Sequence, residues 1–342
     1  MLAIALLGWF LRNANIGHVW GAVRNARPGL LACSLAMVFL TYWARAIRWQ
    51  HLLGPIGPTR FRTALRTTVI GFAATFVLPA RAGDVLRPYL LARQEGLSAS
   101  ATFATIVIER VLDLAAVLML LAFYVWGSGA SGIPEHLRTA IHVSAAVAAF
   151  GAAVLAILMV VLARHPERVG VIVLRVNRVL PHRIADALSS FARAFSEGLI
   201  AVRTPKALGL AFAWSFPLWI LLSLESYFVT RAFGIDMSVT GGYLLQGLLI
   251  IGVAVPTPGG VGGFHEAYRF GVTTFFGASN DSAVGAAIVL HAVSFIPVTL
   301  AGLYFMAQDG MSLRGLKGLA RAAHQAEEPV SDEVPVLRSP GR

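Results

Sequence analysis

Long apolar runs alternate with short polar segments along most of the chain. A helix that crosses the roughly 30 Å hydrocarbon core of a bilayer needs about 20 mostly apolar residues. Five runs reach that length and predict membrane-spanning helices at residues 30–49, 101–126, 140–163, 207–229 and 282–306. Residues 1–11 are apolar but too short to span, and they lack the basic leader and cleavage site of a secretory signal. We expect a short first helix there.

Two further apolar stretches, residues 64–79 and 239–258, are too short or too rich in glycine and proline to cross as ordinary helices. Non-helical backbone at membrane depth is tolerated only where protein or a water-filled cavity shields it. We therefore expect each stretch to dip into the bilayer and return to the side from which it entered. Paired interrupted segments of this kind mark the midplane binding site of many transporters.

Basic residues set the expected orientation. Arginines recur at roughly helical spacing within residues 164–206, which is typical of an amphipathic segment on the cytoplasmic surface. With this segment inside, the first interrupted stretch enters from the cytoplasm and the second enters from outside. A unit of span, interrupted stretch and span then occurs twice in opposite orientations, over residues 30–126 and 207–306. We expect an all-α polytopic helical bundle with an inverted repeat.

One transmembrane domain, residues 1–310, and a disordered cytoplasmic tail, residues 311–342, account for the whole chain. Hydrophobic residues make up 57% and charged residues 13% of the sequence, which excludes a water-soluble globular domain. The formal net charge of +11 would suggest nucleic acid in a soluble protein. Here the basic residues flank apolar runs, where they meet anionic headgroups, so we expect membrane lipids and no nucleic acid as partners.

The single cysteine, Cys33, excludes an intrachain disulfide and argues against a zinc site. The pair His265-Glu266 lacks the second histidine of a zinc-protease helix, because Arg269 stands four residues after His265. Neither a phosphate-binding loop with its lysine nor a Gly-x-Ser-x-Gly nucleophile motif is present. We expect no catalytic residues, no metal and no cofactor.

Charged residues inside the predicted membrane segments are the candidates for function. Glu109, Arg110 and Asp113 interrupt one span, and the two carboxylates, four residues apart, lie on one helical face. A charge at bilayer depth costs about 2.5–3.5 kcal/mol on insertion scales, so these side chains need partners or water. Either they form an internal ion pair that holds helices together, or they line a polar cavity in which Arg110 binds a phosphate oxygen.

The two interruptions supply the other candidates. Charged residues follow the first one at three-residue spacing, as an interfacial cluster or as part of a headgroup site: Arg81, Asp84 and Arg87. The second interruption is either a flexible turn or a segment whose glycines let another helix or a headgroup come very close to the backbone. Its candidates are Pro258, Gly259, Gly260, Gly262, His265 and Glu266. Arg48, beside Trp49, ends the first long span and either anchors it at the interface or meets a lipid phosphate.

Three blocks of sequence are distinctive in combination. They are Arg45-x-x-Arg48-Trp49 with Leu52-Leu53; Leu78-Pro79-Ala80-Arg81-Ala82-Gly83-Asp84 leading through Ser98 to Ala104-Thr105 and Glu109-Arg110-x-x-Asp113; and Pro256-Thr257-Pro258-Gly259-Gly260-Val261-Gly262 with Glu266. Together they resemble the flippase-like membrane domain of bacterial lysyl-phosphatidylglycerol synthases and of many stand-alone proteins. The family's polar positions map onto Arg81, Asp84, Glu109, Arg110, Asp113 and Glu266, and Asp84 departs from the family in standing where glutamate is commoner.

The resemblance implies translocation of a lipid with a polar or anionic headgroup across the bacterial cytoplasmic membrane, through a polar intramembrane groove. The aminoacyl-transferase domain of the two-part synthases is absent from this sequence, so we expect a transporter and not an enzyme. Two alternatives stay open. One is a membrane-embedded lipid-modifying transferase with the carboxylates as acid and base. The other is an accessory subunit of a lipid or glycan biosynthesis enzyme. A lipid-modifying enzyme or a second copy of the chain is therefore a possible partner.

Overall fold

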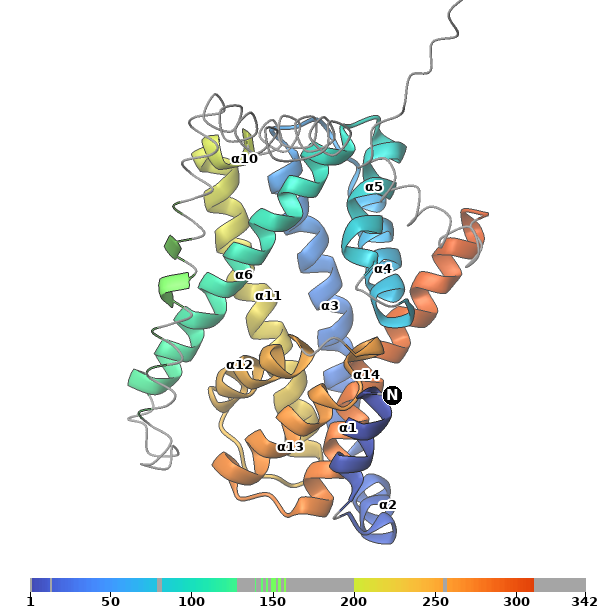
Figure 1. Ribbon diagram of the computed structural model, residues 1–342, viewed down its shortest axis with the longest axis vertical. Coiled ribbons are helices and arrows are strands. Elements are labelled where there is room, and N and C mark those ends of the chain that lie inside the picture. Colours follow the sequence, from blue (N-terminus) through green and yellow to red (C-terminus); the bar gives the residue numbers. More distant parts are fainter. Residues whose placement is uncertain are drawn as a thin grey trace, which may run out of the picture.

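The computed structural model describes residues 2–12, 14–78, 82–127, 200–254 and 257–310, with a few single positions between 139 and 157. Within these residues every regular element is a helix (Figure 1). The helices are α1 (Leu2–Leu11), α2 (Ile16–Asn25), α3 (Pro28–Leu53), α4 (Phe61–Val77), α5 (Gly83–Glu95), α6 (Ala99–Gly127), α10 (Ile200–Arg203), α11 (Pro205–Ala232), α12 (Gly241–Ala254), the 3-10 helix η2 (Pro258–Gly260), α13 (Gly263–Phe276) and α14 (Asn280–Gln308). The prediction of an all-α integral membrane protein is confirmed.

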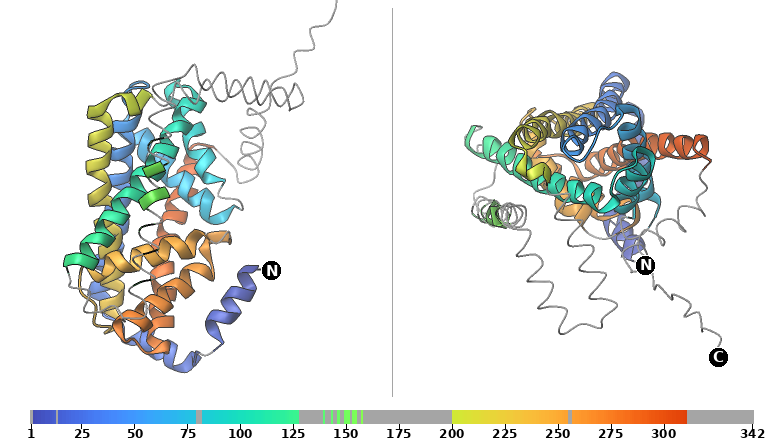
Figure 2. Two further views of the ribbon diagram at one scale, coloured as in Figure 1. Left: turned by 60° about the vertical axis from the view of Figure 1, so that its left-hand side comes forward. Right: turned by 90° about the horizontal axis from the view of Figure 1, so that it is seen from above.

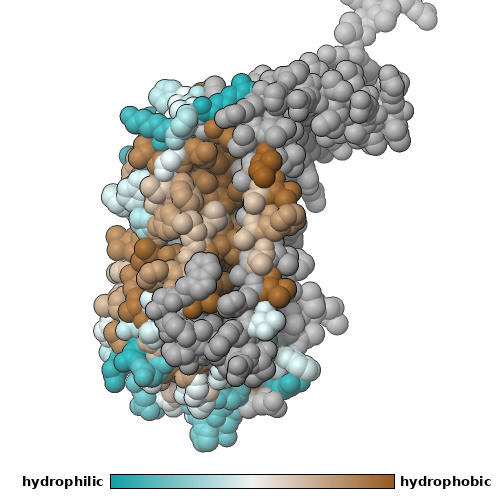
Figure 3. All heavy atoms as spheres, turned by 90° about the vertical axis from the view of Figure 1, so that its left-hand side faces the viewer, coloured by the Kyte–Doolittle hydropathy of each residue, from teal (hydrophilic) through white to brown (hydrophobic). Residues whose placement is uncertain are grey.

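The long helices follow the predicted spans. Among the described helices, α3, α11 and α14 are long and apolar enough to cross a membrane, and α6 reaches 29 residues. Prolines at the first positions of α3 and α11, Pro28 and Pro205, fit helix starts because those backbone nitrogens need no intrahelical partner. On the face drawn in Figure 3, apolar residues form a band that lies between hydrophilic residues at the two ends. The predicted span 140–163, the basic segment 164–206 up to residue 199, and the tail 311–342 lie largely or wholly outside the described residues.

Each interrupted stretch belongs to a helical hairpin. The arms of the first are α4 and α5, and those of the second are α12 and α13, joined through η2. The arms have 13–17 residues, or about 20–26 Å of helix, less than the hydrocarbon thickness. Figures 1 and 2 show the hairpins one above the other, entering the body from opposite ends. The inverted units 30–126 and 207–306 themselves stay a prediction.

The two hairpins meet at their tips and close in the same way. A Cβ on Gly259 would lie 3.5 Å from the Phe76 carbonyl oxygen near the end of α4. In the first hairpin a Cβ on Gly83 would lie 1.7 Å from the Gly71 carbonyl oxygen, and in the second a Cβ on Gly252 would lie 2.5 Å from the Gly263 carbonyl oxygen. Only glycine permits the backbone approaches at Gly83 and Gly252, so each pair of arms packs more closely than ordinary helices do.

Candidate functional site

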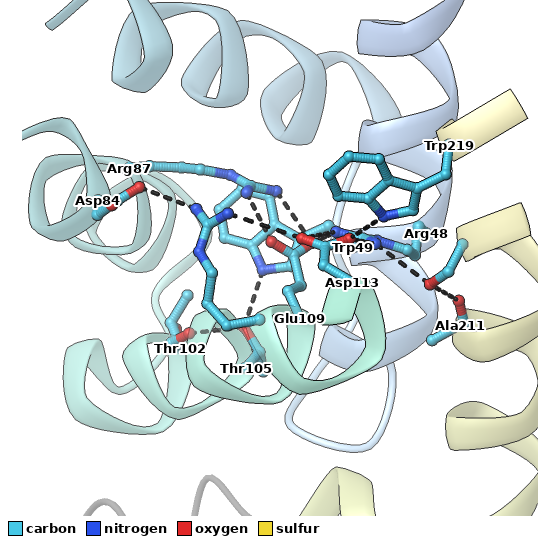
Figure 4. Close-up of polar contacts among 12 residues, drawn as sticks. Arg48, Trp49, Asp84, Arg87, Thr102, Thr105, Glu109, Asp113, Ala211 and Trp219 are labelled. Atoms are coloured by element: carbon cyan, nitrogen blue, oxygen red, sulfur yellow. Dashed lines mark hydrogen bonds and ion pairs between the residues drawn. The ribbon is translucent and has the colours of Figure 1, made fainter. Parts of the chain in front are cut away.

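The charged residues of α6 face α3 and α5 in the interior of the helical body. Six residues form what we call the charged network: Arg48 of α3, Asp84 and Arg87 of α5, and Glu109, Arg110 and Asp113 of α6. Four of them are at most 6% exposed: Arg48, Arg87, Glu109 and Asp113. Figure 4 shows the two α6 carboxylates projecting toward the arginines of the neighbouring helices. The helical face that Glu109 and Asp113 are predicted to share is therefore the face of α6 that contacts these arginines.

Carboxylates and guanidinium groups alternate through the buried part of the network. Arg87 donates from Nη1 to Glu109 Oε2 at 2.8 Å and from Nη2 to Oε1 at 3.4 Å. Arg48 Nη2 lies 3.6 Å from Glu109 Oε1, and Arg48 pairs with Asp113 through both terminal nitrogens. The order Arg87, Glu109, Arg48, Asp113 places opposite charges beside each other, which compensates much of the cost of burying them.

Neutral side chains extend the network to α11 and to Trp49, near the C-terminal end of α3. Trp219 Nε1 donates to Asp113 Oδ1 at 3.0 Å, and Arg48 Nη1 lies 3.2 Å from Ser215 Oγ. The Arg87 guanidinium carbon lies 3.8 Å from the centroid of the Trp49 ring, a cation–π contact. The Trp49 indole also donates to the Thr105 hydroxyl at 2.8 Å. Four helices are thus joined through one polar cluster.

Arg110 forms the open end of the network. Its Nη2 donates to Asp84 Oδ1 at 3.0 Å, and its Nη1 lies 3.6 Å from Asp113 Oδ2. The Arg110 side chain is 39% exposed and that of Asp84 is 31% exposed. A polar group outside the helical body can therefore reach Arg110 without disturbing the buried ion pairs. A guanidinium so placed is suited to a phosphate or carboxylate, which it can bind through two parallel hydrogen bonds.

The sequence matches the family model for the lysylphosphatidylglycerol synthase TM region over residues 1–302. The chain belongs to this family. It is similar to three curated proteins of archaea. It is 24% identical to the glycosyltransferase AglD of Haloferax volcanii, over 92% of this chain and 54% of that protein, so it spans about half of that relative's length. It is 25% identical to a UPF0104 membrane protein of Methanocaldococcus jannaschii, over 66% of the chain and 89% of the relative. It is also 25% identical to one from Methanothermobacter thermautotrophicus, over 89% of the chain and 90% of the relative.

The candidate residues of the second interruption lie apart from the charged network. Glu266 pairs with Arg269, one helical turn away, at 2.9 and 2.5 Å, and Arg269 also donates to Asn280 Oδ1 at 3.0 Å. His265 is 5% exposed, and its Nδ1 accepts a hydrogen bond from the Gly262 backbone N–H at 3.3 Å. Glu266 therefore has its own cation and does not join the charged network.

The glycines at that turn adopt a backbone conformation that favours glycine. Gly259, Gly260 and Gly262 have φ angles of 62°, 69° and 90°, and Pro258 begins η2 just before them. Such angles strain any residue with a Cβ, so the glycines are needed for the shape of the turn. Of the other candidates, Arg81 lies outside the described residues.

The anchoring interpretation of Arg48 and Trp49 is wrong, because both side chains are 0% exposed. Three polar residues of the interior were missed in the sequence: Trp219, Glu225 and Ser294. Glu225 is an acid within a predicted span, and that signal is enough to single it out. Trp219 and Ser294 carry no such signal, since an indole or a hydroxyl is ordinary in a membrane helix.

Proposed function

We propose that this protein translocates a lipid with a polar or anionic headgroup between the leaflets of the bacterial cytoplasmic membrane. The observation that carries the proposal is the charged network. It lies inside a membrane domain and ends at Arg110, whose side chain is partly exposed. Charged side chains in membrane segments are costly, and they commonly mark the path of a substrate or an ion. The acyl chains would stay in lipid while the headgroup passes Arg110.

The geometry at Arg110 supports exchange with a ligand. Asp84, its closest carboxylate partner, is itself partly exposed, so an incoming phosphate can replace Asp84 as the partner of Arg110. The pairs of Arg87 with Glu109 and of Arg48 with Asp113 remain closed during that exchange. The ion-paired interior then acts as a rigid support for Arg110 and is not itself taken apart by the ligand.

The hairpins support a transport role as well. Half-length helical arms that enter from opposite ends and meet at their tips are typical of transporters with a central binding site. In this protein α4 and η2 are in contact, and α5, the second arm of the first hairpin, supplies both Asp84 and Arg87. Movement of that hairpin would therefore change the surroundings of Arg110 directly.

A second candidate function follows from the similarity to the glycosyltransferase AglD. This chain covers about half of that protein, so a membrane domain of this kind can occur together with additional sequence. On this alternative the chain is the membrane subunit of an enzyme that builds a lipid-linked glycan, and it binds the lipid without moving it. Translocation measured in the absence of any other protein distinguishes the two functions.

The test is lipid scrambling in proteoliposomes that contain only the purified protein. Fluorescent lipids with anionic, cationic, zwitterionic and polyprenyl-phosphate-sugar headgroups are compared for the wild type, Arg110→Ala and Arg231→Ala. Arg231 is a matched control because it is 36% exposed and pairs with one carboxylate, Asp236, at the far end of α11. We expect transfer of at least one headgroup by the wild type and the control, and its loss in Arg110→Ala.

Two results would contradict the proposal. Transfer by folded Arg110→Ala at the wild-type rate would show that the network is not the headgroup site. Transfer of no headgroup by folded wild type would reject translocation and favour the glycan-enzyme subunit.

A further inference from the structure

A second buried carboxyl group, outside the charged network, lies where three helices meet. Glu225 of α11 is 4% exposed. The Ser294 hydroxyl, near the midpoint of α14, donates a hydrogen bond to Glu225 Oε1. The Ser34 hydroxyl of α3 donates to the Glu225 backbone oxygen at 3.1 Å. Glu225 forms no ion pair with any residue that the structure describes, so a negative charge on it would have a single hydroxyl donor.

The other buried acids of the protein have much stronger compensation. Glu109 accepts hydrogen bonds from both terminal nitrogens of Arg87 and lies 3.6 Å from Arg48. Asp113 pairs with Arg48 and lies 3.6 Å from Arg110. Each of these carboxylates therefore has two guanidinium groups beside it, whereas Glu225 has none within ion-pair distance among the described residues.

The positions of Arg48 and Glu225 match between two helices that begin in the same way. Both α3 and α11 start with a proline in the first turn, Pro28 and Pro205. Arg48 stands twenty residues after the first of these prolines, and Glu225 stands twenty residues after the second. The two residues are therefore at matching positions of the two predicted units.

The partners of Arg48 and Glu225 match as well. Both α6 and α14 follow a serine whose hydroxyl accepts a hydrogen bond from the backbone N–H three residues on, at 3.3 Å in each case. These serines are Ser98 and Ser279. Asp113 stands fifteen residues after the first serine, and Ser294 stands fifteen residues after the second. The contact of Glu225 with the α14 serine is thus the counterpart of the ion pair between Arg48 and the α6 aspartate.

The two matching contacts differ in charge. In the first unit a guanidinium group, which is always charged, lies against a carboxylate. In the second unit a carboxyl group lies against a neutral hydroxyl. A carboxylate buried without a cation is unfavourable in a medium of low dielectric constant, but a protonated carboxyl group is neutral and can be buried at much lower cost.

We propose that Glu225 is a proton-binding site of the second unit. A proton from bulk water binds to Oε2, which accepts no hydrogen bond from the described residues, while Oε1 keeps the bond from Ser294. Glu225 then stays neutral at neutral pH. The inference goes beyond the proposed function and does not depend on any lipid substrate. When the proton leaves, a negative charge appears at the junction of α3, α11 and α14 and weakens their packing.

The side chains of α3 that face Glu225 do not take the place of the proton. They are Tyr42 and Arg45, which lie about two and three helical turns beyond the residue that contacts the Glu225 backbone, Ser34. Arg45 packs on the Phe72 ring, with its guanidinium carbon 4.7 Å from the ring centroid. Neither Tyr42 nor Arg45 forms a hydrogen bond or an ion pair with Glu225, so Arg45 acts on it only at longer range.

The other helices near Glu225 bring no cation into contact with it. On α14, His291 lies one turn before the serine that contacts Glu225, and its Nε2 is 2.8 Å from the Gly259 carbonyl oxygen. On α13, Tyr268 bonds to a threonine of α11. The only titratable residue of α12 is Tyr243. The charged residues of α6 belong to the charged network, and Arg203 of α10 lies at the opposite end of α11.

Infrared spectroscopy of purified full-length protein in detergent tests the protonation state directly. A protonated carboxyl group has a carbonyl stretch that a carboxylate lacks. The difference spectrum between wild type and Glu225→Gln should contain this band at neutral pH, shifted when water is exchanged for deuterium oxide. Ser294→Ala removes the hydroxyl donor and should move the frequency of the same band. This second variant keeps the test open if Glu225→Gln does not fold.

The dependence of stability on pH gives an independent readout. In unfolded protein a glutamate releases its proton near pH 4.3, about its ordinary value, whereas the folded protein is proposed to keep it. The unfolding equilibrium constant of the wild type should therefore rise with pH, by up to about tenfold for each pH unit above that value, until the folded protein also releases the proton. Titration with sodium dodecyl sulfate at a series of pH values measures this rise, which should be absent from Glu225→Gln.

Matched variants separate this effect from the titration of other groups. Glu225→Asp keeps a carboxyl group and should retain a rise with pH. Asp236→Asn removes a carboxylate that is 97% exposed and should behave as the wild type.

Three results would overturn the inference. The first is a difference spectrum at neutral pH without the carbonyl band of a protonated carboxyl group. The second is a rise of the unfolding equilibrium constant that is as steep in Glu225→Gln as in the wild type. The third is a band that disappears when sodium chloride replaces choline chloride, because Glu225 would then bind sodium in place of a proton. None of these results bears on lipid scrambling, so the proposed function is tested separately.

Discussion

The substitution Glu109→Gln tests whether the charged network is as closed to water as its geometry indicates. Glu109 accepts from both terminal nitrogens of Arg87 and lies 3.6 Å from Arg48. Glutamine has nearly the same shape but no charge. It would leave Arg87, 3% exposed, without a carboxylate among these contacts, and Arg48 with Asp113 alone.

The expected magnitude follows from the burial of the partners. Removing one member of a buried ion pair costs about 3–5 kcal/mol, because the remaining charge stays desolvated. An exposed pair contributes about 0–1 kcal/mol, so the matched control Asp236→Asn should change the free energy of unfolding by less than about 1 kcal/mol. The double variant Glu109→Gln/Arg87→Met removes the stranded cation and should therefore be more stable than Glu109→Gln alone, by about 1–3 kcal/mol.

The assay is reversible unfolding in mixed micelles by titration with sodium dodecyl sulfate, followed by circular dichroism. Two outcomes would refute the reasoning. A cost for Glu109→Gln no larger than that of the exposed control would mean that water already solvates Arg87. A double variant less stable than the single one would mean that Arg87 contributes mainly by packing on Trp49 and not by pairing with Glu109.

Two predictions concern the glycines of the hairpins. Gly83→Ala should prevent α4 and α5 from closing, since its Cβ would lie 1.7 Å from the Gly71 carbonyl oxygen, whereas Gly209→Ala meets nothing within 4 Å. Size-exclusion chromatography should show a monodisperse protein for Gly209→Ala only, and an equal yield of folded Gly83→Ala would contradict the contact. Gly259→Ala has room for its methyl group but keeps a φ of 62°. It should therefore fold and lose about 1–2 kcal/mol in the same detergent titration; no loss would show that the turn relaxes.

The long helices and the hairpins that the structure describes could be predicted from the sequence, because both depend on local properties. Run length sets whether a helix can cross, and the glycines and prolines near residues 79 and 258 mark where the chain turns back. The shared face of Glu109 and Asp113 follows from helical periodicity alone. The position of their arginine partners does not follow from periodicity. Arg48 is more than fifty residues away in the sequence, and its position relative to the two acids depends on how α3 packs against α6.

The error in the interpretation of Arg48 and Trp49 has a specific physical cause. Arg48 and Trp49 were placed at the interface because the apolar run ends there, but α3 continues to Leu53 and carries both residues into the interior. Glu266 is a candidate of the second interruption, and the structure gives it a partner on its own helix. The i, i+3 spacing to Arg269 was already visible in the sequence and accounts for its observed partner.

The shortness of the hairpin arms has a consequence for how the chain is made. An insertion machinery that releases segments into lipid according to length and hydrophobicity can accept α3, α11 and α14 one at a time. The arms α4 and α5 cannot be left alone in lipid, because they are too short to span and Arg87 finds its carboxylate on α6, which is synthesised later. The first hairpin should therefore dock only after α6 has been made, and chains stalled before that step would leave Arg87 without its carboxylate partner.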